Sequence, residues 1–326
     1  MANIYTAQSD TLIETLASHI FKDYGKEIGN NIIDKNFLLK VLDKKNKVMV
    51  VGGLDFTETV MTSENTNFAF RDAKSEITAN LQDPTRTLSF EPMTLTGTIV
   101  INEKHKAMNN GKAAIRSLLK TLQEQADATV ENTVSDAIWD ASPTTGIDPD
   151  SVPTLVSATP TTGSIGGVSR VTNTWARNGI YSTAISDIGS EAGVTTLHAE
   201  RINLAGGISE LPDVAVTTGT LFSGLYGYLD NKRQLRAEEQ MVKLGLENLY
   251  LGTALLGFDP KCPAGYFYYL NSKHLFYKIL DKMNYVFEPF SRKDNSLNST
   301  SIFYLGMNLT TNLPGANKVF TNVSTS

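Results

Sequence analysis

One long amphipathic pattern, from about Lys112 to Trp139, constrains this fold more than any other feature of the sequence. Its apolar residues recur at steps that keep a straight stripe along one face of a helix; they are Ile115, Leu118, Leu119, Leu122, Ala126, Val130, Val134, Ala137 and Ile138. The predicted helix would span on the order of 40 Å, whereas a common helix has about 11 or 12 residues. The stripe also fits the central helix of a globular core, so the length is what indicates a beam-like element.

Patterns typical of strands precede this helix. An apolar run from Val48 to Val51 stops at Gly52, and apolar residues alternate with threonine between Met93 and Ile101, as in a half-buried strand. The segment between the two runs is too polar to fill a core by itself. We therefore expect a projecting hairpin or a long loop there.

Two further apolar patterns lie near the N-terminus. Residues 9–24 repeat apolar side chains near helical spacing, with Ser9 or Asp10 as a cap and Gly25 as a stop. A second apolar patch covers residues 32–42. These patterns fit either a subdomain packed on its own core or an arm that docks on a neighbouring subunit.

The composition changes directly after the long helix. Residues 140–169 contain four prolines and no lysine or arginine, which indicates a domain boundary or a long surface excursion. Beyond it the patterns predict a helix around 195–204, a strand at 214–216 and a helix at about 220–230. The last third, from Leu246 to Val323, reads as apolar and aromatic strands separated by turns.

Composition excludes several classes of protein. The 326 residues suffice for about two domains, and 41% hydrophobic residues argue against disorder. Only 19% are charged and the net charge is −5, so no overall basic field attracts nucleic acid or an anionic membrane. The single Cys262 excludes an intramolecular disulfide framework. We find neither a signal peptide nor an apolar run long enough for a membrane span, and we expect intracellular synthesis.

No motif in the sequence predicts catalysis, and we assign no catalytic, cofactor-binding or metal-binding residues. The histidines lie in unrelated contexts, and neither serine that we considered stands in a nucleophile elbow. Acidic residues on predicted helices have arginine neighbours, which indicates solvated faces. The residues weighed are His19, His105, His198, His274, Ser169, Ser223, Glu200, Glu238, Glu239, Arg201, Arg233 and Arg236.

Two other features resemble sites only superficially. Gly163, Gly166 and Gly167 suggest a phosphate cradle, but the Lys-Ser/Thr ending of a P-loop is missing, so turn glycines are the better interpretation. Cys262 lies between Asp259-Pro260 and Pro263 without a nearby histidine, which indicates a structural turn rather than a nucleophile.

Three ordered stretches resemble one branch of tailed-phage major capsid proteins. They are GGVSRVTNTWARN at 166–178, PDVAVTTGTLFSGLYGYLD at 212–230, and GLENLYLGTALLGFDPKCPAGYFYYLNSKHLFYKI at 245–279. The chain departs from the family pattern at Ala176, where a second tryptophan is usual, and at Thr253-Ala254, where the usual proline is missing. The first half of the chain agrees with the family in the order of its predicted elements rather than in matching sequence motifs.

The resemblance implies an α+β fold of the Hong Kong 97 type, with an N-arm, an extended hairpin called the E-loop, a peripheral domain with a long spine helix, and an axial domain. The expected divisions are residues 1–45 for the N-arm, 46–100 for the E-loop and flanking strands, 101–139 for the peripheral domain with its spine helix, 140–258 for the axial domain, and 259–326 for the return to the peripheral sheet. The polar hairpin would lie over a neighbouring subunit, and the long helix would be the beam beneath it.

The same resemblance implies a non-enzymatic protein of the virion that self-assembles, in the host cytoplasm, into an icosahedral shell of pentamers and hexamers around double-stranded DNA. Implied partners are further copies of the chain, a scaffolding protein, a portal, decoration proteins and DNA contacted non-specifically, with no membrane and no cofactor. Some members of the family join subunits by Lys-to-Asn isopeptide bonds, and Lys74, Asn298 and Asn308 are candidates by residue type alone. The alternatives are an encapsulin-like compartment of the same fold and a soluble enzyme.

Overall fold

The computed structural model describes residues 36–72, 80–102, 104, 112–204, 210–231, 249–292 and 297–325. Its α-helices are α2 (Phe37–Asn46), α4 (Lys112–Ile138), α5 (Val152–Leu155), α6 (Glu191–Leu204) and α7 (Gly219–Asn231). Short 3-10 turns cover Thr174–Ala176, Asp281–Met283 and Pro314–Ala316. Within these described residues no helix is both long enough and apolar enough to span a membrane.

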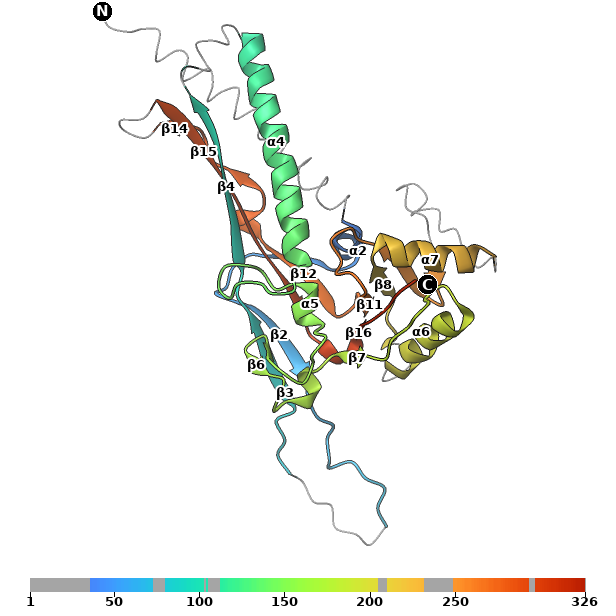
Figure 1. The fold of residues 1–326 in the computed structure, drawn as a ribbon. Helices are drawn as coiled ribbons and strands as arrows, with labels where there is room; N and C mark the ends of the chain where they lie inside the picture. Colours follow the sequence, from blue (N-terminus) through green and yellow to red (C-terminus); the bar gives the residue numbers. More distant parts are fainter. Residues whose placement is uncertain are drawn as a thin grey trace, which may run out of the picture.

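The first of two large sheets is long and narrow, and α4 runs alongside it (Figure 1). Its strands follow the order β1-β12-β15-β13, and both β4 and β14 also pair with β15. The bounds are β1 (Lys47–Val50), β4 (Met93–Asn102), β12 (Leu275–Leu280), β13 (Val286–Phe287), β14 (Ser291–Arg292) and β15 (Asn298–Thr311). Strands β4 and β15 pair antiparallel over ten residues of each, which makes them the backbone of this sheet.

The second sheet lies beside the first and carries α6 and α7 (Figure 1). Its strand order is β7-β16-β11-β8-β10-β9, with both parallel and antiparallel pairs. The bounds are β7 (Gly179–Tyr181), β8 (Val214–Thr217), β9 (Leu249–Leu251), β10 (Ala254–Phe258), β11 (Phe267–Leu270) and β16 (Lys318–Phe320). One hydrophobic cluster includes residues of both sheets, so the two share a core rather than forming separate bodies.

Two small antiparallel ribbons complete the architecture. Strands β2 (Phe56–Met61) and β3 (Thr85–Phe90) form the hairpin predicted between the first strand and the long helix. The described parts of its connection, residues 62–72 and 80–84, which we call the projecting loop, extend from the lower end of the molecule, away from α4 (Figure 1). Strands β5 (Ser164–Ile165) and β6 (Val168–Ser169) form the second ribbon.

The elements expected from the sequence are largely present. The long helix forms as α4, and the alternation of β4 places Ile99 and Ile101 against Leu119 of the helix. The expected helices and the strand of the central region correspond to α6, α7 and β8. Burial of apolar side chains on one face explains why α4 and β4 were predicted, because such a face is visible in the sequence as a period. Strand β8 is buried on both faces and is visible instead as a short apolar run.

The two apolar patterns near the N-terminus compare differently with the structure. The predicted helix at 9–24 lies outside the described residues. The second patch forms α2, and its Phe37 ring packs so closely on β10 that a Cβ on Gly257 would lie 2.3 Å from it. Residues 37–42 therefore pack on their own chain's core.

The C-terminal part of the chain contributes strands to both sheets. The expected division returned residues 259–326 to one sheet, whereas β12 to β15 join the first sheet and β11 and β16 join the second. The chain crosses between the sheets at 271–274 and again at 312–317. Apolar periodicity cannot distinguish the two sheets, because both bury strands on shared core residues.

Candidate functional site

The residues weighed for chemistry do not converge on a catalytic centre. Among the described residues no group of three or more His, Cys, Asp or Glu side chains is arranged to hold a metal. Ser223 donates its hydroxyl to the carbonyl of Gly219 within α7, and Ser169 accepts from the amide of Val171. His19, His105, Arg233, Arg236, Glu238 and Glu239 lie outside the described residues.

Cys262 occupies a buried turn, as expected. The amide of Cys262 donates to the carbonyl of Asp259, and the amide of Lys261 donates to the Asp259 carboxylate. Burial, together with the nearby Asp259 charge, raises the pKa of the Cys262 thiol far above its usual value. The thiol is therefore protonated and weakly reactive at neutral pH.

The glycine-rich segment supports the β2–β3 hairpin. All three glycines that resembled a phosphate cradle have positive φ: +75° at Gly163, +51° at Gly166 and +77° at Gly167. Gly166 accepts a hydrogen bond from the Ser89 amide of β3, and a Cβ on Gly166 would lie 2.7 Å from the Leu88 Cβ. The motif is thus a tight turn that allows two backbones to approach, which confirms the interpretation as turn glycines.

A buried ion pair connects the β2–β3 hairpin to the first sheet. Lys278 Nζ on β12 lies 2.7 Å from Glu58 Oε1 on β2, and the Thr310 hydroxyl of β15 donates to the same carboxylate oxygen. Only 11% of the Lys278 side chain and 13% of the Glu58 side chain are exposed. The ammonium also lies over the Phe56 ring, 5.8 Å from its centroid. These contacts fix the base of the hairpin against the sheet.

A polar cluster lies where the chain crosses between the two sheets. Asp213, directly before β8, accepts hydrogen bonds from Lys45 Nζ of α2 and from the amide and hydroxyl of Ser272, at 2.5, 2.7 and 2.5 Å. The ring of His274 lies between Glu210 and Asn312, with Nε2 2.6 Å from the carboxylate and Nδ1 2.8 Å from the amide oxygen.

The charge of Asp213 is stabilised in this cluster. Burial alone would raise the pKa of its carboxyl, but the hydrogen bonds from Lys45 and Ser272 hold that pKa below the usual value. No pattern in the sequence indicates this cluster, because its members come from segments far apart in the chain and share no motif.

The expectation of solvated charges on α6 is wrong for Arg201. This side chain is buried, with Nε donating to the carbonyl of Pro212 and a second guanidinium nitrogen donating to the Thr253 hydroxyl. Neighbouring Glu200 forms an ion pair with the buried Lys318 of β16. Both residues therefore join α6 to the second sheet. A helical period alone could not reveal this, since it does not show where charged side chains find partners.

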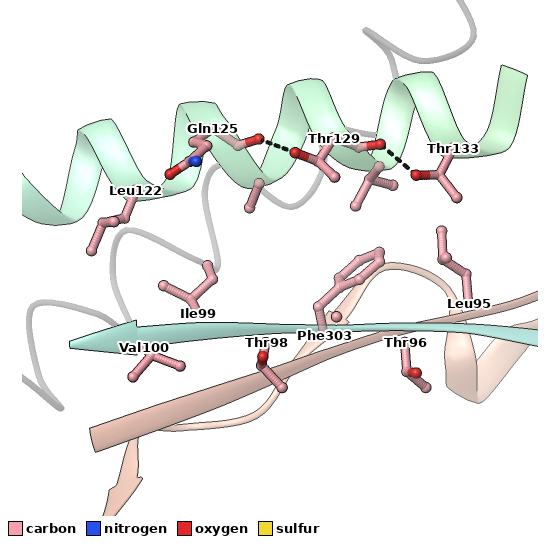
Figure 2. A pocket seen from close by; sticks show the side chains of 13 residues that line it. Leu95, Thr96, Thr98, Ile99, Val100, Leu122, Gln125, Thr129, Thr133 and Phe303 are labelled. Carbon is pink, nitrogen blue, oxygen red and sulfur yellow. Dashed lines mark hydrogen bonds between the residues drawn. The ribbon is translucent and has the colours of Figure 1, made fainter. Parts of the chain in front are cut away.

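A groove lies between α4 and β4, and we call it the α4–β4 groove. Its volume is about 380 Å³. Figure 2 shows Leu95, Ile99 and Phe303 pointing from the sheet toward the helix, while Leu122 and Thr129 come from the helix. The Thr129 and Thr133 hydroxyls donate to the carbonyls of Gln125 and Thr129, so these hydroxyls are satisfied within the helix. The groove is therefore a largely apolar surface.

The two asparagines considered for covalent linkage are already engaged. Asn308 is fully buried, its amide nitrogen donating to the Glu91 carbonyl and the Asp150 carboxylate. The Asn298 side-chain oxygen accepts a hydrogen bond from the Asn102 amide at 2.7 Å. Lys74 lies outside the described residues. The position of Asn308 disfavours attack on its amide by a lysine of another subunit.

Comparison with known proteins identifies the architecture. No protein-family model matches the sequence, and no curated protein matches it. Among solved structures, the chain is similar to the cyanophage A-1(L) capsid asymmetric unit, with 14% identity, 89% of this chain and 93% of the other covered, and a TM-score of 0.65. This chain has the Hong Kong 97-type capsid fold.

Two further capsid-fold structures show the breadth of the likeness. A capsid chain of the native GTA particle has 13% identity, with 87% of this chain and 90% of the other covered and a TM-score of 0.57. The SrpI encapsulin complex from Synechococcus elongatus PCC 7942 has 10% identity, with 88% of each chain covered and a TM-score of 0.53. Because the likeness extends over most of each chain, it concerns the fold as a whole rather than a single sheet of it.

Proposed function

We propose that this protein is the major capsid protein of a tailed phage and assembles into an icosahedral shell. The observation that carries the proposal is the likeness to the cyanophage capsid subunit, which covers about nine tenths of both chains. The subunit's role is structural, and its residues act by contact rather than by chemistry. In the finished particle it would belong to the virion, and assembly would take place in the host cytoplasm.

In the proposed mechanism of assembly, the same subunit fold forms both rings of five copies and rings of six copies. Small changes in the angle between neighbouring subunits would adapt the same fold to either ring. Many modest contacts then add through multivalency. In this scheme the second sheet belongs to the axial domain near the ring centre, and the first sheet with α4 belongs to the peripheral domain.

Low charge suits such a subunit. With only 19% charged residues, the surface can be covered by sister subunits without burying many unpaired ions. The net charge of −5 provides no overall attraction to packaged double-stranded DNA, so any contact with the DNA would be local and non-specific. A scaffolding protein, a portal and decoration proteins would be the other partners of the shell.

Negative-stain microscopy of the purified protein tests this proposal. We expect closed particles or rings, with light scattering showing masses many times the 35.6 kDa subunit. A monodisperse monomer at every protein and salt concentration, alone and with a co-expressed scaffolding protein, would contradict the proposal and favour the soluble-enzyme alternative.

A protein compartment is the second candidate, because one similar structure is an encapsulin. The contents of particles isolated from the native source distinguish the two. A phage shell should protect double-stranded DNA from nuclease, whereas a compartment should contain protein cargo and no nuclease-resistant DNA. The same preparation therefore decides between two proteins that share the fold.

A further inference from the structure

Strand β4 has one long edge that no strand of the described residues pairs with. All ten of its residues, Met93–Asn102, pair with β15 on one edge, and none of the described strands lies on the other. The other edge strands of the two large sheets are short: β1 has four residues, β7 and β9 have three each, and β13 and β14 have two each. The free edge of β4 is therefore the longest that the described part of either sheet offers to a partner.

The sequence of this edge lacks the features that usually prevent strand addition. Edge strands commonly carry lysine, other charged residues or proline, which keep a further strand from pairing. Residues 93–102 read MTLTGTIVIN and contain neither a charged residue nor a proline. Such an edge offers an antiparallel partner roughly one main-chain hydrogen bond per residue pair.

The main chain of β4 is also accessible beside α4. Figure 2 shows Thr96, Thr98 and Val100 pointing away from the helix, yet all three line the α4–β4 groove, so they line it through their main chain. From β15 only Phe303 reaches the groove, and no charged side chain lines it. The groove therefore follows β4 and leaves room beside the helix for the apolar side chains of an added strand.

Strand β4 is complementary to a second copy of itself. When two such strands pair antiparallel about a two-fold axis perpendicular to the sheet, each residue stays on its own face of the sheet. With the axis near Gly97, Leu95 and Ile99 of both copies lie on the helix side, and the threonines of both copies lie on the other. A Cβ on Gly97 would find only Phe303 nearby, at 3.7 Å, so the centre of the pair is not crowded. Because neither strand carries a charge, the two copies do not repel each other.

A shell built from rings needs a contact of this symmetry. Contacts that repeat head to tail close into rings and leave neighbouring rings unconnected. An isologous contact uses the same surface on both partners, so it can join a subunit of one ring to a subunit of the next. The pairing of β4 with its own copy requires no second protein.

We propose that the free edge of β4 pairs antiparallel with β4 of a second copy and so joins neighbouring rings of subunits. The proposal rests on the proposed self-assembly, and it goes beyond it by naming the surface that two rings share. The first sheet of one subunit then continues into the first sheet of the other, with both α4 helices on the same face.

Thiol cross-linking of assembled particles tests the contact directly. Thr96→Cys and Thr98→Cys, made separately, should each give dimers with a short bismaleimide linker, because side chains across paired strands lie about 5 Å apart, or about 7 Å on the diagonal. The matched control is Thr300→Cys, which lies on the same face but on β15, one strand farther from the free edge. Native Cys262 is buried and should not react. Absence of dimers from both β4 variants, or an equal yield of dimers in the control, would overturn the proposal.

Charges placed at the proposed axis supply a second test. Thr98→Lys and Thr98→Glu, each alone, should reduce the yield of closed particles at least about tenfold, because like charges would then face each other across the pair. An equimolar mixture of the two variants should restore closed particles, since opposite charges can now meet. Thr300→Lys is the control and should assemble normally. Thr98 is exposed, so the circular dichroism and melting temperature of the free subunit should not change. A mixture that assembles no better than either variant alone would contradict the pairing of β4 with itself.

The outcomes separate this contact from the proposed function. If the unchanged protein never forms particles, the proposed function fails. If it forms particles and Thr98→Lys assembles as well as it does, only the β4 contact is refuted. If the contact joins rings, Thr98→Lys should instead accumulate separate rings of subunits, which negative-stain microscopy would show.

Discussion

Glu58 and Lys278 join the β2–β3 hairpin to the first sheet through an ion pair that is largely screened from water. Their charges are costly to bury and are stabilised by each other and by the Thr310 hydroxyl. Asp213 has an equivalent place between the two sheets, where Lys45 and Ser272 satisfy its carboxylate. At both junctions, single side chains fix the relative position of parts that pack against each other.

Replacing Glu58 leaves a buried cation without its partner. We expect Glu58→Gln to lower the free energy of unfolding by about 3 kcal/mol. Urea unfolding of the free subunit, followed by tryptophan fluorescence, measures the change. Glu58→Gln combined with Lys278→Met is the control, because it removes both charges and should cost less than the sum of the two single variants. Strict additivity would show that the pair does not couple.

The low pKa of Asp213 predicts a specific dependence on pH. Because the folded-state pKa lies below the unfolded value of about 3.9, the stabilisation is complete above that value and is lost as the pH falls through the folded pKa. At pH 7 Asp213→Asn should cost about 2 kcal/mol, the value of hydrogen bonds to a charged group. The difference from the unchanged protein should shrink below about pH 4. A difference that is constant from pH 7 to pH 3 would contradict this assignment.

Among the elements, the β5–β6 turn limits how the hairpin is placed. Gly166→Ala would put a methyl group 2.7 Å from the Leu88 Cβ at a φ of +51°. Gly167 has a φ of +77°, and a Cβ there meets nothing within 4 Å. The two glycines therefore separate the cost of backbone strain from the cost of close packing.

We expect Gly167→Ala to cost about 1 kcal/mol, from the left-handed conformation alone. Gly166→Ala should cost roughly 2 kcal/mol more, because β3 must move away from the turn. Thermal unfolding of the two variants side by side measures the difference. Equal losses would show that β3 accommodates the methyl group and that the approach of the two backbones is not limiting.

The sequence predicted individual elements better than their assembly. The long helix, β4 and α7 each bury a periodic apolar face, which is a local property and is visible without a structure. The division of the last strands between the two sheets depends on pairing between distant segments, as does the burial of Arg201. The resemblance to capsid proteins supplied the architecture that periodicity could not.

The candidate site was predictable only in part. A projecting polar hairpin was expected from composition, but its exposed Phe68 and Phe70 were not singled out, because two phenylalanines in a polar segment have no period. The α4–β4 groove is lined by residues of the helix, of β4 and by Phe303 of β15, which lie far apart in the sequence, so a local pattern could not reveal it. The polar cluster around Asp213 likewise required the fold.

For the whole molecule, we expect particles held together without covalent bonds between subunits. The amide of Asn308 is buried and engaged by Glu91 and Asp150, so a lysine of another subunit could not reach it. A denaturing gel of assembled particles should show one band near 35.6 kDa. Bands at multiples of this mass, resistant to heat and reducing agent, would contradict the expectation and require another asparagine as the acceptor.

Strand β16 has a consequence for the timing of synthesis. It lies between β7 and β11 in the second sheet, although it follows β7 in the chain by all of α6, α7 and the strands β8 to β15. A chain still being translated lacks this strand until the ribosome has passed Phe320, so β7 cannot join the sheet earlier. The second sheet of a nascent chain therefore cannot be completed until this late part of the sequence has been synthesised.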